Sequence, residues 1–86
     1  MSDLQQQFDT AAADSRKLSE RPDNDTLLKI YALYKQGSAG DAEEGSRPGF
    51  TDMIGQVKYD AWAKLKGLSR EDAMRQYVAL INSLKD

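Results

Sequence analysis

Tyrosines and lysines supply the side chains of this chain that are best suited to binding chemistry. Tyr31, Tyr34 and Lys35 stand together in the stretch IYALYKQG, and Lys58 and Tyr77 follow on later segments. Tyr31 and Lys35 are four residues apart, so on a helix a phenol and an ammonium point the same way and can reach one anion. The pattern is therefore compatible with a site for a flat, anionic ligand. Helical spacing by itself favours the other interpretation, in which the tyrosines are core residues whose hydroxyls reach solvent.

The composition argues against most kinds of catalysis. The chain has 86 residues and contains neither cysteine nor histidine. Without histidine it lacks the side chain most used for acid–base work near neutral pH, and without both it lacks the usual zinc and thiol chemistry. A serine nucleophile would have only a lysine or a carboxylate as its base. We therefore expect a protein that is not an enzyme and that holds no metal or cofactor.

The net charge and the hydropathy of the chain argue against a nucleic-acid partner and against a membrane-spanning segment. The chain carries 12 basic and 14 acidic residues, a formal net charge of −2, so it has no basic field for nucleic acid. Its apolar runs are too short to span a membrane, and MSDLQQQF does not resemble a secretory leader. We expect a single domain over residues 1–86, located in the cytoplasm.

Two loop motifs are close to known anion and cation sites but do not match them. Gly40 and Gly45 have phosphate-loop spacing, yet Ser46 and Arg47 replace the lysine and hydroxyl residue that should follow. The segment from Asp41 to Asp52 has the length of a calcium loop but lacks its central glycine and its terminal glutamate. Neither motif predicts a site.

Helical periodicity covers most of the chain. Apolar residues recur every three or four positions in four segments, and we expect helices over residues 3–19, 25–38, 51–66 and 70–85. In the third segment the predicted apolar face consists of Met53, Val57, Ala61 and Leu65. Ser2, Asp23 or Asn24, and Ser69 are predicted N-caps, and Gly67 is a predicted C′ residue. Trp62 is expected to anchor the core. The stretch 37–50 contains four glycines and a proline and predicts a long connection.

Several motifs in one order resemble the acyl-CoA-binding protein family. They are IYALYKQ, then GD, then RPG, then KYDAWAKLKGLSREDAMRQYVALI, and the similarity runs from about Phe8 to about Leu84. The resemblance implies an all-α, four-helix bundle of up-down-down-up topology, with a long crossover loop between the second and third helices. It also implies a soluble intracellular carrier and buffer of medium- to long-chain fatty acyl-CoA thioesters, which performs no chemistry on them.

The resemblance also implies roles for individual residues. Tyr31, Lys35 and Lys58 match residues that hold the 3′-phosphate of the nucleotide, and Arg16 stands where a nucleotide-reaching lysine is common. Tyr34 matches the aromatic residue that packs against the adenine. Further matches are implied for the pantetheine and acyl groove, namely Tyr77, Phe8, Ala11, Ala12 and Leu28.

The sequence departs from the family pattern near the implied site. Tyr59 replaces the tryptophan that is usual beside the site lysine, Lys58, and Ile54 replaces a lysine one turn before Lys58. Gly37 and Ser38 stand where alanine and threonine are frequent. The loss of one cation implies a weaker electrostatic hold on the nucleotide.

Two other functions are weighed beside the carrier. One is a helical protein–protein interaction module, in which an aromatic groove would bind a partner helix. The other is a thioesterase, which the missing histidine disfavours. The carrier interpretation predicts acyl-CoA as the only small-molecule partner and requires no more than a monomer. It is compatible with a transient membrane contact during loading, with no transmembrane segment and no nucleic acid.

Overall fold

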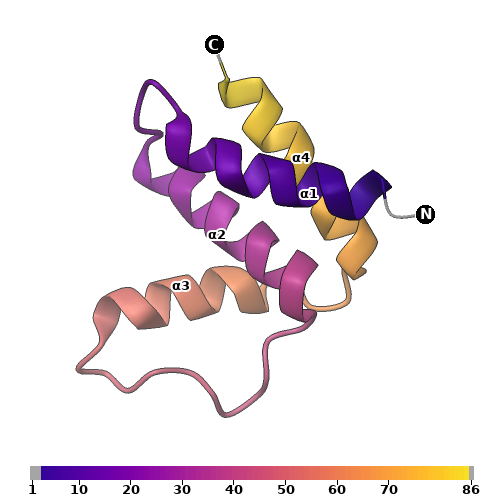
Figure 1. Ribbon diagram of the computed structural model, residues 1–86. Helices are drawn as coiled ribbons and strands as arrows, with labels where there is room; N and C mark the ends of the chain where they lie inside the picture. The colour runs from indigo at the N-terminus through magenta and orange to yellow at the C-terminus, as the bar shows by residue number, and fades with distance from the viewer. Residues whose placement is uncertain (1–2, 86) are drawn as a thin grey trace.

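The structure is a computed structural model that describes residues 3–85, and this part of the chain is helical throughout its regular structure. The elements are α1 (Asp3–Asp14), a short 3₁₀ turn (Ser15–Lys17), α2 (Asn24–Ala39), α3 (Met53–Ala63) and α4 (Arg70–Leu84). In Figure 1, α1 runs from right to left, α2 and α3 both run from left to right, and α4 returns upward. The predicted all-α, four-helix bundle with up-down-down-up topology is confirmed. None of the described helices is long and apolar enough to cross a membrane.

Side-chain caps set the start of three helices. The Asp23 carboxylate accepts from the Thr26 amide at 2.8 Å, and the Ser69 hydroxyl accepts from the Asp72 amide at 3.0 Å, so both predicted caps are confirmed. The Asp52 carboxylate plays the same part for α3 by accepting from the Gly55 amide at 3.0 Å. The predicted cap at Ser2 lies outside the described residues.

Two helices end earlier than their apolar stripes suggested. The α-helix of α1 stops at Asp14, where the Ser15 hydroxyl donates to the Ala12 carbonyl at 2.7 Å and the chain tightens into the 3₁₀ turn. Helix α3 stops at Ala63, and irregular turns continue to Gly67. Gly67 has the positive φ of 93° that favours glycine, but it lies beyond the end of α3 and is not its C′ residue.

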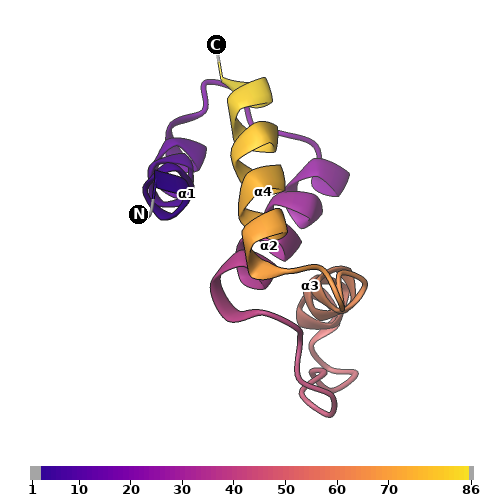
Figure 2. The same cartoon turned by 90° about the vertical axis from the view of Figure 1, so that its right-hand side faces the viewer.

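The buried core lies between α1, α2 and α4. Within residues 3–85, the buried members of this core all come from those three helices: Phe8, Ala11, Leu33, Ala73, Met74, Tyr77 and Ile81. Helix α3 contributes no buried residue, and Trp62 is only half-buried, so the prediction that it anchors the core is wrong. The reason is that α3 packs mainly on α2, and Figure 2 shows it set apart from α1.

Gly37 lies inside α2, where the ring of Phe8 approaches the helix closely. A Cβ at this position would stand 3.1 Å from two ring carbons of Phe8 and 3.2 Å from the Cγ of Met74. These distances are shorter than ordinary contact, so a side chain here would displace its neighbours. The glycine that departs from the family pattern therefore has a packing role.

A buried amide on α2 connects this helix to the crossover loop and to the turn between α3 and α4. Gln36 is fully buried, and its Nε2 donates to the Asp41 carboxylate at 2.7 Å and to the Leu68 carbonyl at 2.8 Å. The same carboxylate accepts from the Gly67 amide at 3.0 Å. The hydrogen bonds from Gln36 and Gly67 lower the pKa of Asp41. The start of the crossover loop, residues 40–52, is thus tied to the end of α2 and to the α3–α4 turn.

Candidate ligand-binding site

Two adjoining hollows lie beside α2 and share Leu27 and Tyr31 as lining residues. The first, which we call the α2–α3 hollow, measures about 560 Å³ and is lined by Arg21, Asn24, Leu27, Leu28, Tyr31, Met53, Ile54, Val57 and Lys58. The second, which we call the tyrosine hollow, measures about 250 Å³ and is lined by Ala12, Ser15, Arg16, Leu27, Ile30, Tyr31, Tyr34 and Tyr77. Tyr31 therefore stands at the boundary between them.

Aromatic rings form one wall of the tyrosine hollow. The Tyr34 ring stacks on Phe8, with centroids 5.4 Å apart and planes 18° apart, and it lies 5.8 Å from the Tyr77 ring. Phe8 itself is buried, so it supports Tyr34 from the core side. Because Tyr34 remains 41% exposed, part of its ring is free to receive another planar group.

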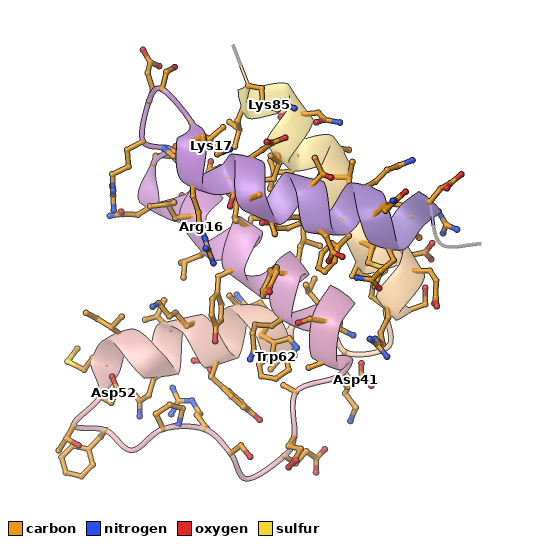
Figure 3. The ribbon with its side chains drawn as sticks, viewed as in Figure 1. Arg16, Lys17, Asp41, Asp52, Trp62 and Lys85 are labelled. Carbon is orange, nitrogen blue, oxygen red and sulfur yellow. The ribbon has the colours of Figure 1, made fainter. Side chains whose placement is uncertain are left out.

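Tyr77 and Arg16 give the same hollow its polar character. Tyr77 is buried, and this burial raises the pKa of its phenol, an effect that Ser15 and Arg16 only partly offset. The phenol therefore stays protonated at neutral pH and can donate a hydrogen bond. Arg16 stands on the 3₁₀ turn, and Figure 3 shows its side chain extending from the end of α1 toward the side of the molecule that holds α3.

The α2–α3 hollow combines an apolar wall with cations. Helix α3 supplies Met53, Ile54 and Val57, and α2 supplies two leucines. Arg21 and Lys58 are its charged lining residues, and none of the carboxylate-bearing residues that the structure describes belongs to the lining. A hydrocarbon chain suits the wall, and an anionic group suits the cations.

Two cation–aromatic pairs cross between α2 and α3. The Lys58 ammonium lies 5.5 Å from the centre of the Tyr31 ring, and the Lys35 ammonium lies 4.9 Å from the Trp62 ring. Each helix provides one aromatic residue and one lysine, four positions apart, so the pairs repeat after one turn. Contacts of this kind are worth about 0.5–1 kcal/mol at exposed sites. They hold both ammonium groups between the helices before any ligand arrives.

The structure brings together most of the residues that the sequence singled out. The tyrosine hollow contains Arg16, Tyr34, Tyr77 and Ala12, and the α2–α3 hollow contains Lys58 and Leu28, with Tyr31 common to both. That these residues contact a ligand stays a prediction.

Three predicted site residues lie elsewhere. Lys35 is not part of either lining and rests on Trp62, one turn beyond Tyr31. Phe8 and Ala11 are buried in the core, and Ala11 borders a separate hollow between α1 and α4. For Phe8 the structure indicates support of Tyr34 rather than an open groove surface.

Sequence reasoning missed Arg21 and misjudged the apolar face of α3. Met53 and Val57 fit a core stripe by their spacing, but they are exposed and line the α2–α3 hollow instead. Because α3 packs mainly against α2, the first turns of its stripe have no helix to cover them. The available signal was Ile54, an apolar residue outside that stripe, which also faces the hollow.

Tyr59, the other departure from the family pattern, serves the crossover loop. Its hydroxyl donates to the Glu43 carbonyl, and its ring meets Trp62 edge-on at 6.3 Å. Trp62 in turn donates from Nε1 to the Gly40 carbonyl at 2.8 Å. The two rings therefore fix the loop against α3 beside the Lys35 ammonium.

Together the fold and the hollows define a small helical protein with an amphipathic ligand-binding surface. Comparison with known proteins is consistent with this description. The family model described as Acyl CoA binding protein matches residues 5–81. The chain therefore belongs to the acyl-CoA-binding protein family, and the resemblance seen in the sequence is confirmed.

Relatives from animals match over nearly their whole length. The acyl-CoA-binding protein homolog of Manduca sexta is 52% identical over 81 residues, which cover 94% of this chain and 90% of the relative. The acyl-CoA-binding protein homolog 1 of Caenorhabditis elegans is 48% identical over 77 residues, which cover 90% of this chain and 88% of the relative.

Solved structures show the same fold. The crystal structure of Oryza sativa acyl-CoA-binding protein 2 matches with a TM-score of 0.86 and 33% identity, covering 94% of this chain and 89% of that one. The crystal structure of the protein from Moniliophthora perniciosa matches with a TM-score of 0.84 and 34% identity, covering 98% of this chain and 80% of that one.

Proposed function

We propose that this protein binds coenzyme A thioesters of medium- to long-chain fatty acids and acts as their intracellular carrier and buffer. Membership of the family supports the proposal. The structural observation that carries it is the junction at Tyr31 between a hollow lined by aromatic and cationic groups and a hollow with an apolar wall. An acyl-CoA has the same division, with an anionic nucleotide at one end and a hydrocarbon chain at the other.

The nucleotide end is assigned to the polar groups around this junction. We assign the 3′-phosphate to Tyr31, Lys35 and Lys58, with Arg16 as a further cation. Charge-assisted hydrogen bonds are the strong ones, at about 1.5–3 kcal/mol each. Tyr34 offers its exposed ring to the adenine, and stacking of this type is worth about 1–3 kcal/mol.

Lys35 must leave Trp62 to take part. Its contact with the Trp62 ring is worth about 0.5–1 kcal/mol, whereas a hydrogen bond to a phosphate oxygen is worth about 1.5–3 kcal/mol. The Lys35 ammonium therefore prefers the phosphate to the Trp62 ring. Its side chain is long and flexible enough to change partner by rotating about its own bonds.

The acyl chain provides most of the remaining affinity. We assign it to the apolar wall of the α2–α3 hollow at Leu28 and to the surface that continues past Tyr31 to Ala12 and Tyr77 in the tyrosine hollow. Burying one methylene is worth up to about 0.8 kcal/mol, so half of a sixteen-carbon chain could supply about 6 kcal/mol before ordering costs. Coenzyme A without the chain should therefore bind orders of magnitude more weakly, and a free fatty acid should bind poorly.

The remaining properties are proposed on the same basis. The chain acts as one domain and as a monomer in the cytoplasm, and it releases its ligand chemically unchanged. Burial raises the pKa of Tyr77, so its phenol stays protonated at neutral pH. Hydrolysis of a thioester needs an unprotonated base, and this phenol therefore fits binding better than catalysis. Contact with membranes is transient and occurs while ligand is loaded.

Calorimetric titration at moderate salt tests the proposal. Palmitoyl-coenzyme A, its analogue without the 3′-phosphate, coenzyme A and palmitate are titrated separately into the protein. We expect tight one-to-one binding of the first, a loss of at least tenfold for the analogue, and weak binding of the last two. Absence of binding to palmitoyl-coenzyme A, or the same affinity with and without the 3′-phosphate, would contradict the proposal and favour a groove for a partner helix. Release of free thiol would instead indicate a thioesterase.

A further inference from the structure

The methionines are the side chains of this protein that a mild oxidant attacks most readily. The sequence contains three methionines and no cysteine, so no thiol competes for the oxidant. Met1 lies outside the described residues, and the other two differ in their surroundings. Met53 is 72% exposed, whereas Met74 is 6% exposed. The structure therefore sets one accessible sulfur against one protected sulfur.

The accessible sulfur belongs to the apolar wall of the α2–α3 hollow. Met53 is the first residue of α3, and it lines this hollow together with Ile54 and Val57. It follows Asp52, which Figure 3 places at the end of α3 opposite Trp62. An exposed thioether thus forms part of the hollow whose wall we assign to the acyl chain.

The other sulfur is enclosed by the core of the same protein. Met74 belongs to the buried cluster of α1, α2 and α4. The backbone of Gly37 lies so close that a Cβ there would stand 3.2 Å from the Met74 Cγ. An oxidant reaches this sulfur only when the core opens, and core segments open with a free energy close to that of global unfolding. Met74 is therefore an internal reference for a reaction at Met53.

Oxidation changes the wall of the hollow from apolar to polar. The thioether sulfur gives an electron pair to one oxygen of hydrogen peroxide, so that a sulfur–oxygen bond forms and the oxygen–oxygen bond breaks. The released hydroxide takes a proton and leaves as water, so the sulfur is oxidised and the peroxide is reduced by two electrons. The sulfoxide oxygen is an acceptor, and Arg21 and Lys58 line the same hollow as donors. An acyl chain that packs on this wall must then displace water from a polar group.

We propose that Met53 is a peroxide-sensitive modification site and that its conversion to the sulfoxide weakens binding of the acyl chain. The change is reversible, because methionine sulfoxide reductases return the thioether. The residues assigned to the 3′-phosphate are not altered, so the nucleotide end binds as before. The effect on affinity rests on the proposed function, whereas the selective oxidation rests only on the exposure of the two sulfurs.

Peptide mass spectrometry tests the modification site. The protein is treated with hydrogen peroxide at neutral pH, samples are quenched with catalase, and the gain of one oxygen is followed at Met53 and at Met74. We expect Met53 to be oxidised at least about tenfold faster than Met74. Urea denaturation of the protein oxidised at Met53 alone should give the free energy of unfolding of the untreated protein, because an exposed side chain supports no core.

Calorimetric titration tests the consequence for binding. Palmitoyl-coenzyme A should bind the protein oxidised at Met53 about tenfold more weakly than the untreated protein. The affinity for coenzyme A without an acyl chain should change less than about twofold, because the nucleotide end does not use this wall. Treatment with methionine sulfoxide reductases for both sulfoxide epimers should restore the original affinity for palmitoyl-coenzyme A.

Two matched variants show which sulfur is responsible. Leucine replaces methionine with little change in volume, and each variant is compared with itself before and after peroxide. The effect of the substitution itself therefore cancels. Met53→Leu should keep its own affinity after treatment, whereas Met74→Leu should lose about tenfold, as the wild type does.

The outcomes separate this proposal from the proposed function. Equal oxidation rates at Met53 and Met74 would overturn the proposal, and so would unchanged affinity for palmitoyl-coenzyme A after complete oxidation of Met53. An equal loss in wild type and Met53→Leu would overturn it as well. Failure of the untreated protein to bind palmitoyl-coenzyme A would instead overturn the carrier function and, with it, the effect on affinity. The two oxidation rates would still decide whether Met53 is the modification site.

Discussion

The two halves of this bundle are held together in different ways. Helices α1, α2 and α4 bury a continuous apolar core, whereas α3 buries no residue and is attached to α2 by half-buried rings, a hydrogen bond from Trp62 and two lysine–ring contacts. The tyrosine hollow lies on the surface of the core half, and the α2–α3 hollow lies between the two halves. The difference teaches that stability and ligand contact are carried by largely separate residues.

The two halves meet at polar contacts. Gln36 joins the end of α2 to Asp41 and to Leu68, and the crossed pairs of lysines and aromatic rings join α2 to α3. The lysine–ring contacts can be exchanged for ligand contacts with little loss of free energy, unlike the buried hydrogen bonds of Gln36 or a packed apolar core. Changes in the two halves should therefore have different consequences.

The largest expected effect is on the core half. Ile81 is fully buried, and Ile81→Ala should lower the free energy of unfolding by about 2–5 kcal/mol, because it removes buried methyl groups and leaves a cavity. Urea denaturation followed by circular dichroism measures the change. The matched change in the other half is Val57→Ala on α3, where the side chain is exposed, and it should alter stability by less than about 0.5 kcal/mol. Similar losses of unfolding free energy in the two variants would show that α3 contributes to stability in the same way as the core half.

The next largest effects are on binding. Lys35→Ala or Tyr31→Phe should weaken binding of palmitoyl-coenzyme A by about 1–3 kcal/mol, because each removes a group assigned to the phosphate, while stability changes little. Calorimetric titration and denaturation are both measured. Lys29→Ala, on the same helix but beside another hollow, is the control and should leave affinity unchanged within about twofold. Loss of stability with unchanged affinity would show that the residue serves packing.

A smaller effect on stability is expected at Trp62, where α3 meets the end of α2. Trp62→Phe keeps an aromatic ring beneath Lys35 but removes the donor to the Gly40 carbonyl, which should lower the free energy of unfolding by about 0.5–1.5 kcal/mol. Hydrogen exchange should show faster opening of α3 and the crossover loop than of α4. Global unfolding with uniform exchange would mean that Trp62 anchors the core after all.

The smallest effect concerns pH. The pKa of Asp41 is lowered in the folded protein, so its charged form contributes stability above its unfolded pKa of about 4, and this contribution is lost as pH falls through the lower folded value. Asp41→Asn keeps an oxygen that can accept from Gln36 and from the Gly67 amide, but it does not titrate. The free energy of unfolding of this variant should therefore fall less between pH 5 and pH 2.5 than that of the wild type, as measured by denaturation across that range. An equal slope would show that Asp41 is not coupled to folding.

The sequence located the helices of the core half and singled out several of the residues that line the two hollows. Helical periodicity located four helices, and the capping residues Asp23 and Ser69 marked the start of two of them. The spacing of Tyr31 and Lys35 correctly placed two polar groups on one side of α2, but it could not show that Lys35 rests on Trp62. The errors gather on α3, whose length, exposed stripe and half-buried tryptophan were all misjudged.

What the sequence determined by itself is local: the helices, their caps, the glycine-rich connection and the residue types around Tyr31. These follow from hydrogen bonding and side-chain spacing within a few residues. Which apolar stripe is buried was decided only by the tertiary structure, because an amphipathic face is covered only where another helix packs on it. The crossover loop sets α3 against α2, and that placement leaves Met53, Ile54 and Val57 exposed beside the hollow while Ile81 is buried.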